Sequence, residues 1–132
     1  MLLRCAFSEI KSIQKQVKDQ DPQPSFYAVA RGVPVWWRGS SFQKLAPSWD
    51  LIKDGKAKKI SWTEYEDRFL EEILCRKGII NLLKAIWKMS EQQDVYLVCW
   101  EKTEKEMMDT ECHTVTLIAL VQELSYDQKW SC

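Results

Sequence analysis

The apolar run at residues 95–100, Val-Tyr-Leu-Val-Cys-Trp, constrains the fold more than any other part of the chain. A short run that is rich in β-branched and aromatic residues is typical of a strand buried on both faces. After a charged stretch, Cys112 and His113 open a segment whose apolar residues recur at helical spacing. A buried strand, a loop and an amphipathic helix in this order indicate an α/β fold with parallel strands.

The same alternation extends over most of the chain and predicts a three-layer α/β domain with a small, mainly parallel sheet. Residues 33–49 contain two prolines and four tryptophan or phenylalanine rings, so we expect an irregular segment there. The basic run at residues 53–59 is expected to be a solvated turn. The expected strands are residues 1–7, 25–30 and 95–100. Four helices are expected: the first is capped by Ser8, the second is capped by Thr63, the third follows Gly78, and the fourth begins at Cys112.

Length and charge limit the classes of protein that fit. The chain has 132 residues, 45% of them hydrophobic, which suits one domain spanning residues 1–132. The 19 basic residues equal the 19 acidic ones, so no overall field draws the molecule to nucleic acid or to a membrane. No apolar run approaches the ~20 residues of a membrane span, and no signal peptide is visible at the start. We expect a soluble, cytoplasmic protein without a membrane partner, and the pattern sets no oligomeric state.

The chain has five cysteines, an odd number, and they are scattered along the sequence. No two of them form a Cys-x-x-Cys pair. This usage argues against a disulfide framework and predicts free cysteines in a reducing compartment.

Candidate site residues follow the expected strands or begin the last helix. In parallel sheets, ligands bind beyond the carboxyl ends of the strands. Arg31 and Glu101 fall at such ends, and Cys112 and His113 lie at the amino end of the following helix. We therefore expect these side chains to meet along one edge of the sheet, where Arg31 would hold a small anionic ligand.

Two residues of this edge have alternative roles. Cys112 at a helix amino end would have a lowered thiol pKa and would serve as a nucleophile, or it packs as a small apolar residue. His113 paired with Glu101 would be a general base, or the pair only holds the loop in place.

A metal site would need Cys99, Glu101, Cys112 and His113 as ligands. Alternation along the strand and the divergence of neighbouring helical residues argue against such a gathering, so no metal is expected. There is also no glycine-rich phosphate loop, and nothing in the pattern demands a cofactor.

The segment at residues 31–49 supports a second class of function. Arg31, Arg38, Trp36 and Trp37 would stack bases and hold phosphates in a nucleic-acid or protein interaction module. The alternative, which we favour, is that these rings pack inward and cover the edge of the sheet. Nucleic acid is thus a less favoured partner than a small anionic ligand, which Cys99 would also help to bind.

Several motifs resemble an uncharacterised family, the domain of unknown function 488. They are residues 29–39, 45–49, 62–65, 98–102 and 112–113. In that family a Cys-aromatic-Glu-Lys strand end and a Cys-His-Arg helix start are characteristic, and the resemblance implies a Rossmann-like α/β fold. It supplies no reaction, so whether the protein is an enzyme stays open. Two departures are visible: Thr114 stands where the family has arginine, and the loop at residues 102–111 is longer.

Overall fold

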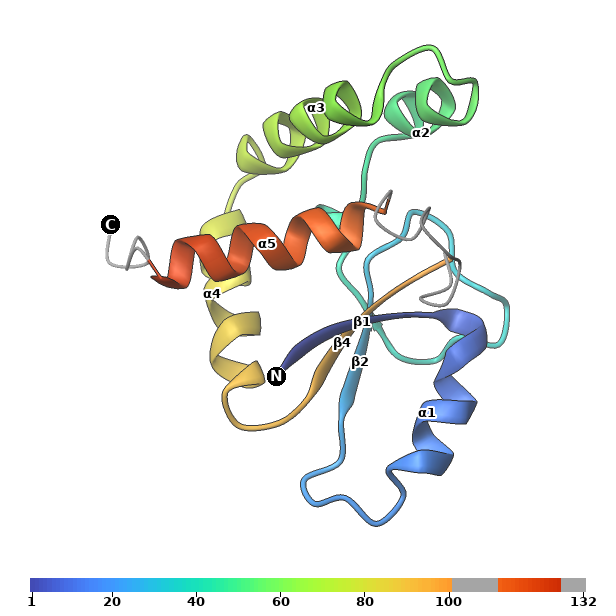
Figure 1. Ribbon diagram of the computed structural model, residues 1–132, viewed down its shortest axis with the longest axis vertical. Helices are drawn as coiled ribbons and strands as arrows, with labels where there is room; N and C mark the ends of the chain where they lie inside the picture. Colours follow the sequence, from blue (N-terminus) through green and yellow to red (C-terminus); the bar gives the residue numbers. More distant parts are fainter. Residues whose placement is uncertain (101–111, 127–132) are drawn as a thin grey trace.

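The computed structural model describes residues 1–100 and 112–126 (Figure 1). Within these residues, four parallel strands form one sheet in the order β1-β4-β2-β3. The strands are β1 (Leu2–Ala6), β2 (Ser25–Ala28), β3 (Ser40–Ser41) and β4 (Val95–Cys99). The helices are α1 (Ile10–Gln16), α2 (Trp49–Lys56), α3 (Trp62–Leu74), α4 (Ile79–Ser90) and α5 (His113–Tyr126), and short 3-10 turns occupy Phe7–Glu9 and Gln43–Leu45. The predicted Rossmann-like α/β fold with parallel strands is confirmed.

Strand β4 lies between β1 and β2 and is buried on both faces. Leu97 pairs with Arg4 of β1 and with Tyr27 of β2. Successive residues of β4 point to opposite faces of the sheet. Val95 and Leu97 belong to the core on one face, and Val98 belongs to the core on the other. Helices α4 and α5 cover the first face and α1 covers the second (Figure 1), which gives three layers.

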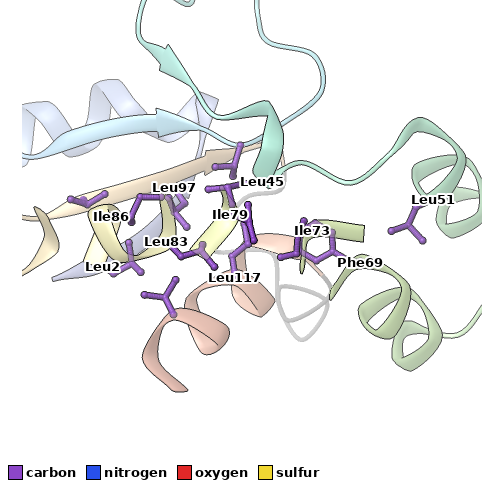
Figure 2. Packing of buried hydrophobic residues seen from close by; sticks show 13 residues of the cluster. Leu2, Leu45, Leu51, Phe69, Ile73, Ile79, Leu83, Ile86, Leu97 and Leu117 are labelled. Carbon is purple, nitrogen blue, oxygen red and sulfur yellow. The ribbon is translucent and has the colours of Figure 1, made fainter. Parts of the chain in front are cut away.

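The larger core fills the space between the sheet, α4 and α5, and it extends to α3 (Figure 2). Leu83 and Ile86 of α4 and Leu117 of α5 are almost fully buried there. Burial of each such side chain contributes roughly 1.5–3 kcal/mol to stability. This core holds the amino end of α5 against the carboxyl end of β4, which is the edge of the sheet where the site residues were expected.

The smaller core lies under α1. Cys5, Ile10 and Val98 are buried together, and the ring of Phe7 meets the ring of Trp37 at a centroid distance of 5.4 Å. Ser8 lies inside the 3-10 turn and not at a cap, so the prediction that it caps a helix was wrong. The carboxylate of Glu9 instead accepts a hydrogen bond from the backbone N–H of Ala6 at 2.8 Å.

The basic segment at residues 53–59 was predicted to be a solvated turn, and this was wrong for most of its length because α2 runs from Trp49 to Lys56. Ser48 caps α2, since its hydroxyl accepts a hydrogen bond from the N–H of Leu51 at 3.2 Å. The side chain of Leu51 is fully buried and anchors the helix to the core. One cap and one buried leucine are thus enough to fold a short helix among lysines.

Helix α2 packs closely on α3. Gly55 permits this contact, because a Cβ at this position would lie 3.0 Å from the ring of Tyr65. The guanidinium of Arg68 on α3 pairs with the Asp54 carboxylate at 2.8 Å. The two helices form a unit that lies away from the sheet, at the top of Figure 1.

The remaining helix boundaries differ from the prediction by a few residues. Helix α3 is capped by Ser61, not Thr63, because the Ser61 hydroxyl accepts from the N–H of Glu64 at 3.1 Å. Gly78 precedes α4 as predicted, with a left-handed φ of 76° that favours glycine. Of the helices in residues 1–100 and 112–126, none combines the length and the apolar content that crossing a membrane requires.

Candidate functional site

Four side chains meet where β4 ends and α5 begins, and they form what we call the thiol cluster: Arg4, Cys99, Cys112 and Thr114. The sulfur atoms of Cys99 and Cys112 lie 3.3 Å apart, and Cys112 Sγ lies 3.0 Å from Thr114 Oγ1. Arg4 donates from Nε to Thr114 Oγ1 at 2.8 Å and from Nη2 to Cys99 Sγ at 3.6 Å. Both cysteines and Thr114 are buried. The cluster therefore joins the first strand, the central strand and the last helix.

The environment of Cys112 favours its ionised form. The pKa of the Cys112 thiol falls from 9.0 to about 3, chiefly because of the hydrogen bond with Cys99. Burial acts in the opposite direction, since desolvation disfavours a charged group. Hydrogen bonds from His113 and Thr114 and the charge of His113 lower the pKa further. These contacts favour the Cys112 thiolate over the protonated thiol.

Arg4 is the cation that faces this thiolate. Burial alone would lower the pKa of Arg4, but the charge of Cys112 and the hydrogen bond to Cys99 outweigh it and raise the pKa. Cys5 is the contrasting case on the other face of the sheet, where burial and then the nearby Glu9 raise the thiol pKa to about 12. Burial thus raises the pKa of the Cys5 thiol, and the donors of the thiol cluster lower the pKa of the Cys112 thiol.

His113, the first residue of α5, is held from two sides. Its Nε2 lies 2.7 Å from the carbonyl oxygen of Val29 and donates a hydrogen bond to it. The ring stands edge-on to Phe69 of α3, with a centroid distance of 5.5 Å and an interplanar angle of 76°. The imidazole is 7% exposed. These contacts fix the ring at the boundary between the core and the cavity described next.

A cavity of about 710 Å³ opens beside His113 at the carboxyl edge of the sheet, and we call it the edge cavity. It lies between the end of β2, the α2 and α3 unit and the start of α5. Its lining residues are Ala30, Arg31, Gly32, Pro47, Trp49, Ile52, Gly55, Lys56, Lys58, Ile60, Ser61, Trp62, Tyr65, Trp100 and His113.

The charges on the edge cavity are all of one sign. Arg31, Lys56 and Lys58 line it, and no carboxylate of the described residues does. Arg31 is positioned by a hydrogen bond from its Nε to the carbonyl oxygen of Pro47 at 2.9 Å. A concave surface that gathers three cations concentrates positive potential and favours an anion.

Aromatic rings form much of the remaining wall. Trp100 is 55% exposed and is fixed by a hydrogen bond from Nε1 to the carbonyl oxygen of Gly32 at 3.0 Å. Trp49 is 58% exposed. Trp62 and Tyr65 stack on each other with a centroid distance of 5.2 Å. Flat apolar surfaces therefore stand next to the three cations.

The site residues that were expected at the edge of the sheet divide into three groups. Arg31 and His113 line the edge cavity. Cys99 and Cys112 lie in the thiol cluster and not on the cavity wall. Glu101, with its predicted pairing to His113, lies outside the described residues.

The Trp-rich candidates do not reach the edge cavity. Trp37 is half-buried against Phe7, and Trp36 packs edge-on to the same ring with a centroid distance of 6.2 Å. The guanidinium of Arg38 donates to the carbonyl oxygens of Val35 and Trp37. The ring of Phe7 and hydrogen bonds within the segment thus hold these residues. Trp36 is still 52% exposed, so the expected inward packing applies to Trp37 and not to Trp36.

Sequence reasoning missed most of the cavity wall. Trp49, Lys56 and Lys58 become neighbours of Arg31 only because α2 is a helix that packs on α3. Arg4 was also missed, although a charged side chain in the middle of an apolar, partly buried strand needs a partner. In the part of the chain that the structure describes, no three histidine, cysteine, aspartate or glutamate side chains gather as metal ligands.

Together, the parallel sheet, the buried thiol cluster and the cationic cavity define a Rossmann-like α/β domain with a candidate site at the carboxyl edge of its sheet. The model of the family described as DUF488-N3a, the active DUF488-N3 subclade, matches residues 15–125. The chain therefore belongs to the DUF488 family. No curated protein and no solved structure gives a significant match.

Proposed function

We propose that this protein binds a small anionic ligand in the edge cavity, at the carboxyl edge of its sheet. The observation that carries the proposal is the set of charges on the wall, where Arg31, Lys56 and Lys58 are not balanced by any carboxylate of the described residues. The net charge of the whole chain is zero, so this concentration is local. A site of this sign attracts phosphate, sulfate or carboxylate groups.

An enzymatic use of the bound ligand has less support than binding alone. His113 lines the edge cavity, and the Cys112 thiolate is the preceding residue. A thiolate is the reactive form of cysteine, but the Cys112 side chain is 2% exposed and lies off the cavity wall, so it is not positioned to attack a ligand in the edge cavity.

A nucleic-acid interaction module built on residues 31–49 has less support. Trp37 packs on Phe7 and Nη1 of Arg38 donates to two backbone carbonyl oxygens, which leaves Trp36, 52% exposed, as the open ring among these three residues.

Titration calorimetry with pyrophosphate tests the proposed binding. The variant Lys56→Gln with Lys58→Gln removes two charges from the cavity wall, and we expect its Kd to rise by about tenfold or more. The matched control is Lys53→Gln with Lys59→Gln, which removes two exposed charges from the same segment but none from the wall. The control should stay within about twofold of the unmodified protein, because exposed charges away from the site are screened. Equal losses in both variants, or no binding by the unmodified protein, would overturn the proposal.

A further inference from the structure

The aromatic part of the edge cavity narrows the chemistry of its ligand beyond a simple anion. Four rings, those of Trp49, Trp62, Tyr65 and Trp100, stand on the same wall as the three cations. A site for inorganic phosphate alone needs donors and charge and has no use for such surfaces. The rings therefore favour a ligand that carries a flat apolar group as well as an anionic one.

Two of these rings, Trp49 and Trp100, keep more than half of their surface exposed to solvent. Trp49 is 58% exposed although it begins α2, and Trp100 is 55% exposed although it follows a buried strand. Large rings of a small domain normally bury most of their surface. The indole of Trp100 is also fixed, through its bond to the carbonyl oxygen of Gly32, and a fixed ring stacks on a ligand at little cost in conformational entropy.

We propose that the edge cavity is a site for a mononucleotide, whose base stacks on the Trp49 and Trp100 surfaces while its phosphate meets Arg31, Lys56 and Lys58. This inference rests on the proposed function, because it assigns a ligand class to the same cavity. The volume of about 710 Å³ lies within the range of roughly 300–1,000 Å³ that is usual for ligands of this size.

A free nucleotide suits the chain better than a nucleic-acid strand. The basic residues (19) only balance the acidic ones (19), so the surface as a whole offers no attraction to a polyanion. The cations of the described wall are gathered in one concave place and not spread along a groove. This arrangement fits one nucleotide with its phosphate.

Binding measured by calorimetry with three probes tests the inference. AMP carries both ring and phosphate, ribose 5-phosphate carries only the charge, and adenosine carries only the ring. Base stacking is worth about 1–3 kcal/mol, so AMP should bind roughly 5- to 150-fold more tightly than ribose 5-phosphate. Adenosine should bind more weakly than AMP.

Two variants locate the stacking surface. Trp100→Leu and Trp49→Leu should each reduce the preference for AMP over ribose 5-phosphate, while the Kd for ribose 5-phosphate changes little. Trp36→Leu is the matched control, because Trp36 is 52% exposed and lies off the cavity wall. The use of two variants keeps the test valid if one of them fails to fold.

The outcomes separate this inference from the proposed function. Equal affinity for AMP and ribose 5-phosphate would overturn the nucleotide assignment and leave anion binding intact. Equal affinity for AMP and adenosine would overturn the role of the phosphate, and no binding of any probe would overturn both. Tighter binding of a single-stranded oligonucleotide than of AMP would show that the ligand is a polymer and would also overturn the inference.

Discussion

The sulfur atoms of Cys99 and Cys112 lie 3.3 Å apart, where the last residue of β4 meets the residue that precedes α5. The hydrogen bond between them is the main cause of the lowered pKa of Cys112. A residue of the central strand thus controls the ionisation of a residue at the start of the last helix. The next three predictions concern this pair of cysteines.

The Cys112 thiol should ionise at a pH far below the usual pKa of a cysteine thiol. A pH titration of the thiolate ultraviolet absorbance should show one thiolate that persists down to a pH of about 3, and this signal should be missing in Cys112→Ser. The Cys5 thiol, whose pKa is about 12, serves as the internal reference that stays protonated over the same range. An absorbance that appears only near pH 9 would contradict the assignment.

The ionisation of Cys112 depends on Cys99 as a hydrogen-bond donor. Cys99→Ala removes the largest contribution that lowers the Cys112 pKa, so the absorbance titration should shift to higher pH. Cys99→Ser keeps a donor in a similar volume and should restore most of the shift. An alanine variant that titrates like the unmodified protein would show that Cys99 only fills space.

Because the folded-state pKa of Cys112 is depressed, its ionisation stabilises the native state above the unfolded pKa, and this contribution is lost as the pH falls toward about 3. The difference in unfolding free energy between the unmodified protein and Cys112→Ser should therefore grow as the pH rises from about 3 toward 9.0. Urea unfolding at a series of pH values measures this difference. A difference that does not change with pH would contradict the depressed pKa.

Gly78 should resist substitution, because its φ of 76° is left-handed. We expect Gly78→Ala to lower the free energy of unfolding by about 1–2 kcal/mol. Gly32→Ala is the control, since a Cβ there would meet no atom within 4 Å, and its stability should change by less than about 0.5 kcal/mol. Urea unfolding of the two variants measures both changes in the free energy of unfolding. Similar losses for Gly78→Ala and Gly32→Ala would refute the prediction.

The strand and helix alternation could be predicted from the sequence because buried strands and amphipathic helices leave periodic patterns. The apolar run at residues 95–100 predicted β4 within one residue, and Gly78 marked the start of α4. Strand ends then placed Arg31 and His113 near one edge, since parallel strands share that edge. Both residues line the edge cavity.

The rest of the candidate site depends on tertiary packing. Helix α2 is short and contains Gly55, so its pattern is weak, and it is held by the Ser48 cap, by Leu51 in the core and by contacts with α3. Its residues could not be assigned to the cavity wall without those contacts. The thiol cluster likewise needs the register that pairs Arg4 with Leu97, which no local pattern reveals.

The structure shows what Thr114 contacts at the position where the sequence departs from the resemblance. Thr114 stands where the resemblance implies an arginine, and the Nε of Arg4 donates to its hydroxyl. A guanidinium from β1 thus stands next to the position where the resemblance implies one on the helix.

The most direct test of the central claim, that the edge cavity holds an anion, is the position of a bound anion in a crystal. Tungstate is an electron-rich phosphate analogue whose anomalous signal marks its place. We predict a peak within hydrogen-bonding distance of the Arg31 guanidinium and beside Lys56 or Lys58, next to the start of α5. A cavity that stays empty while tungstate binds elsewhere on the protein would contradict the account.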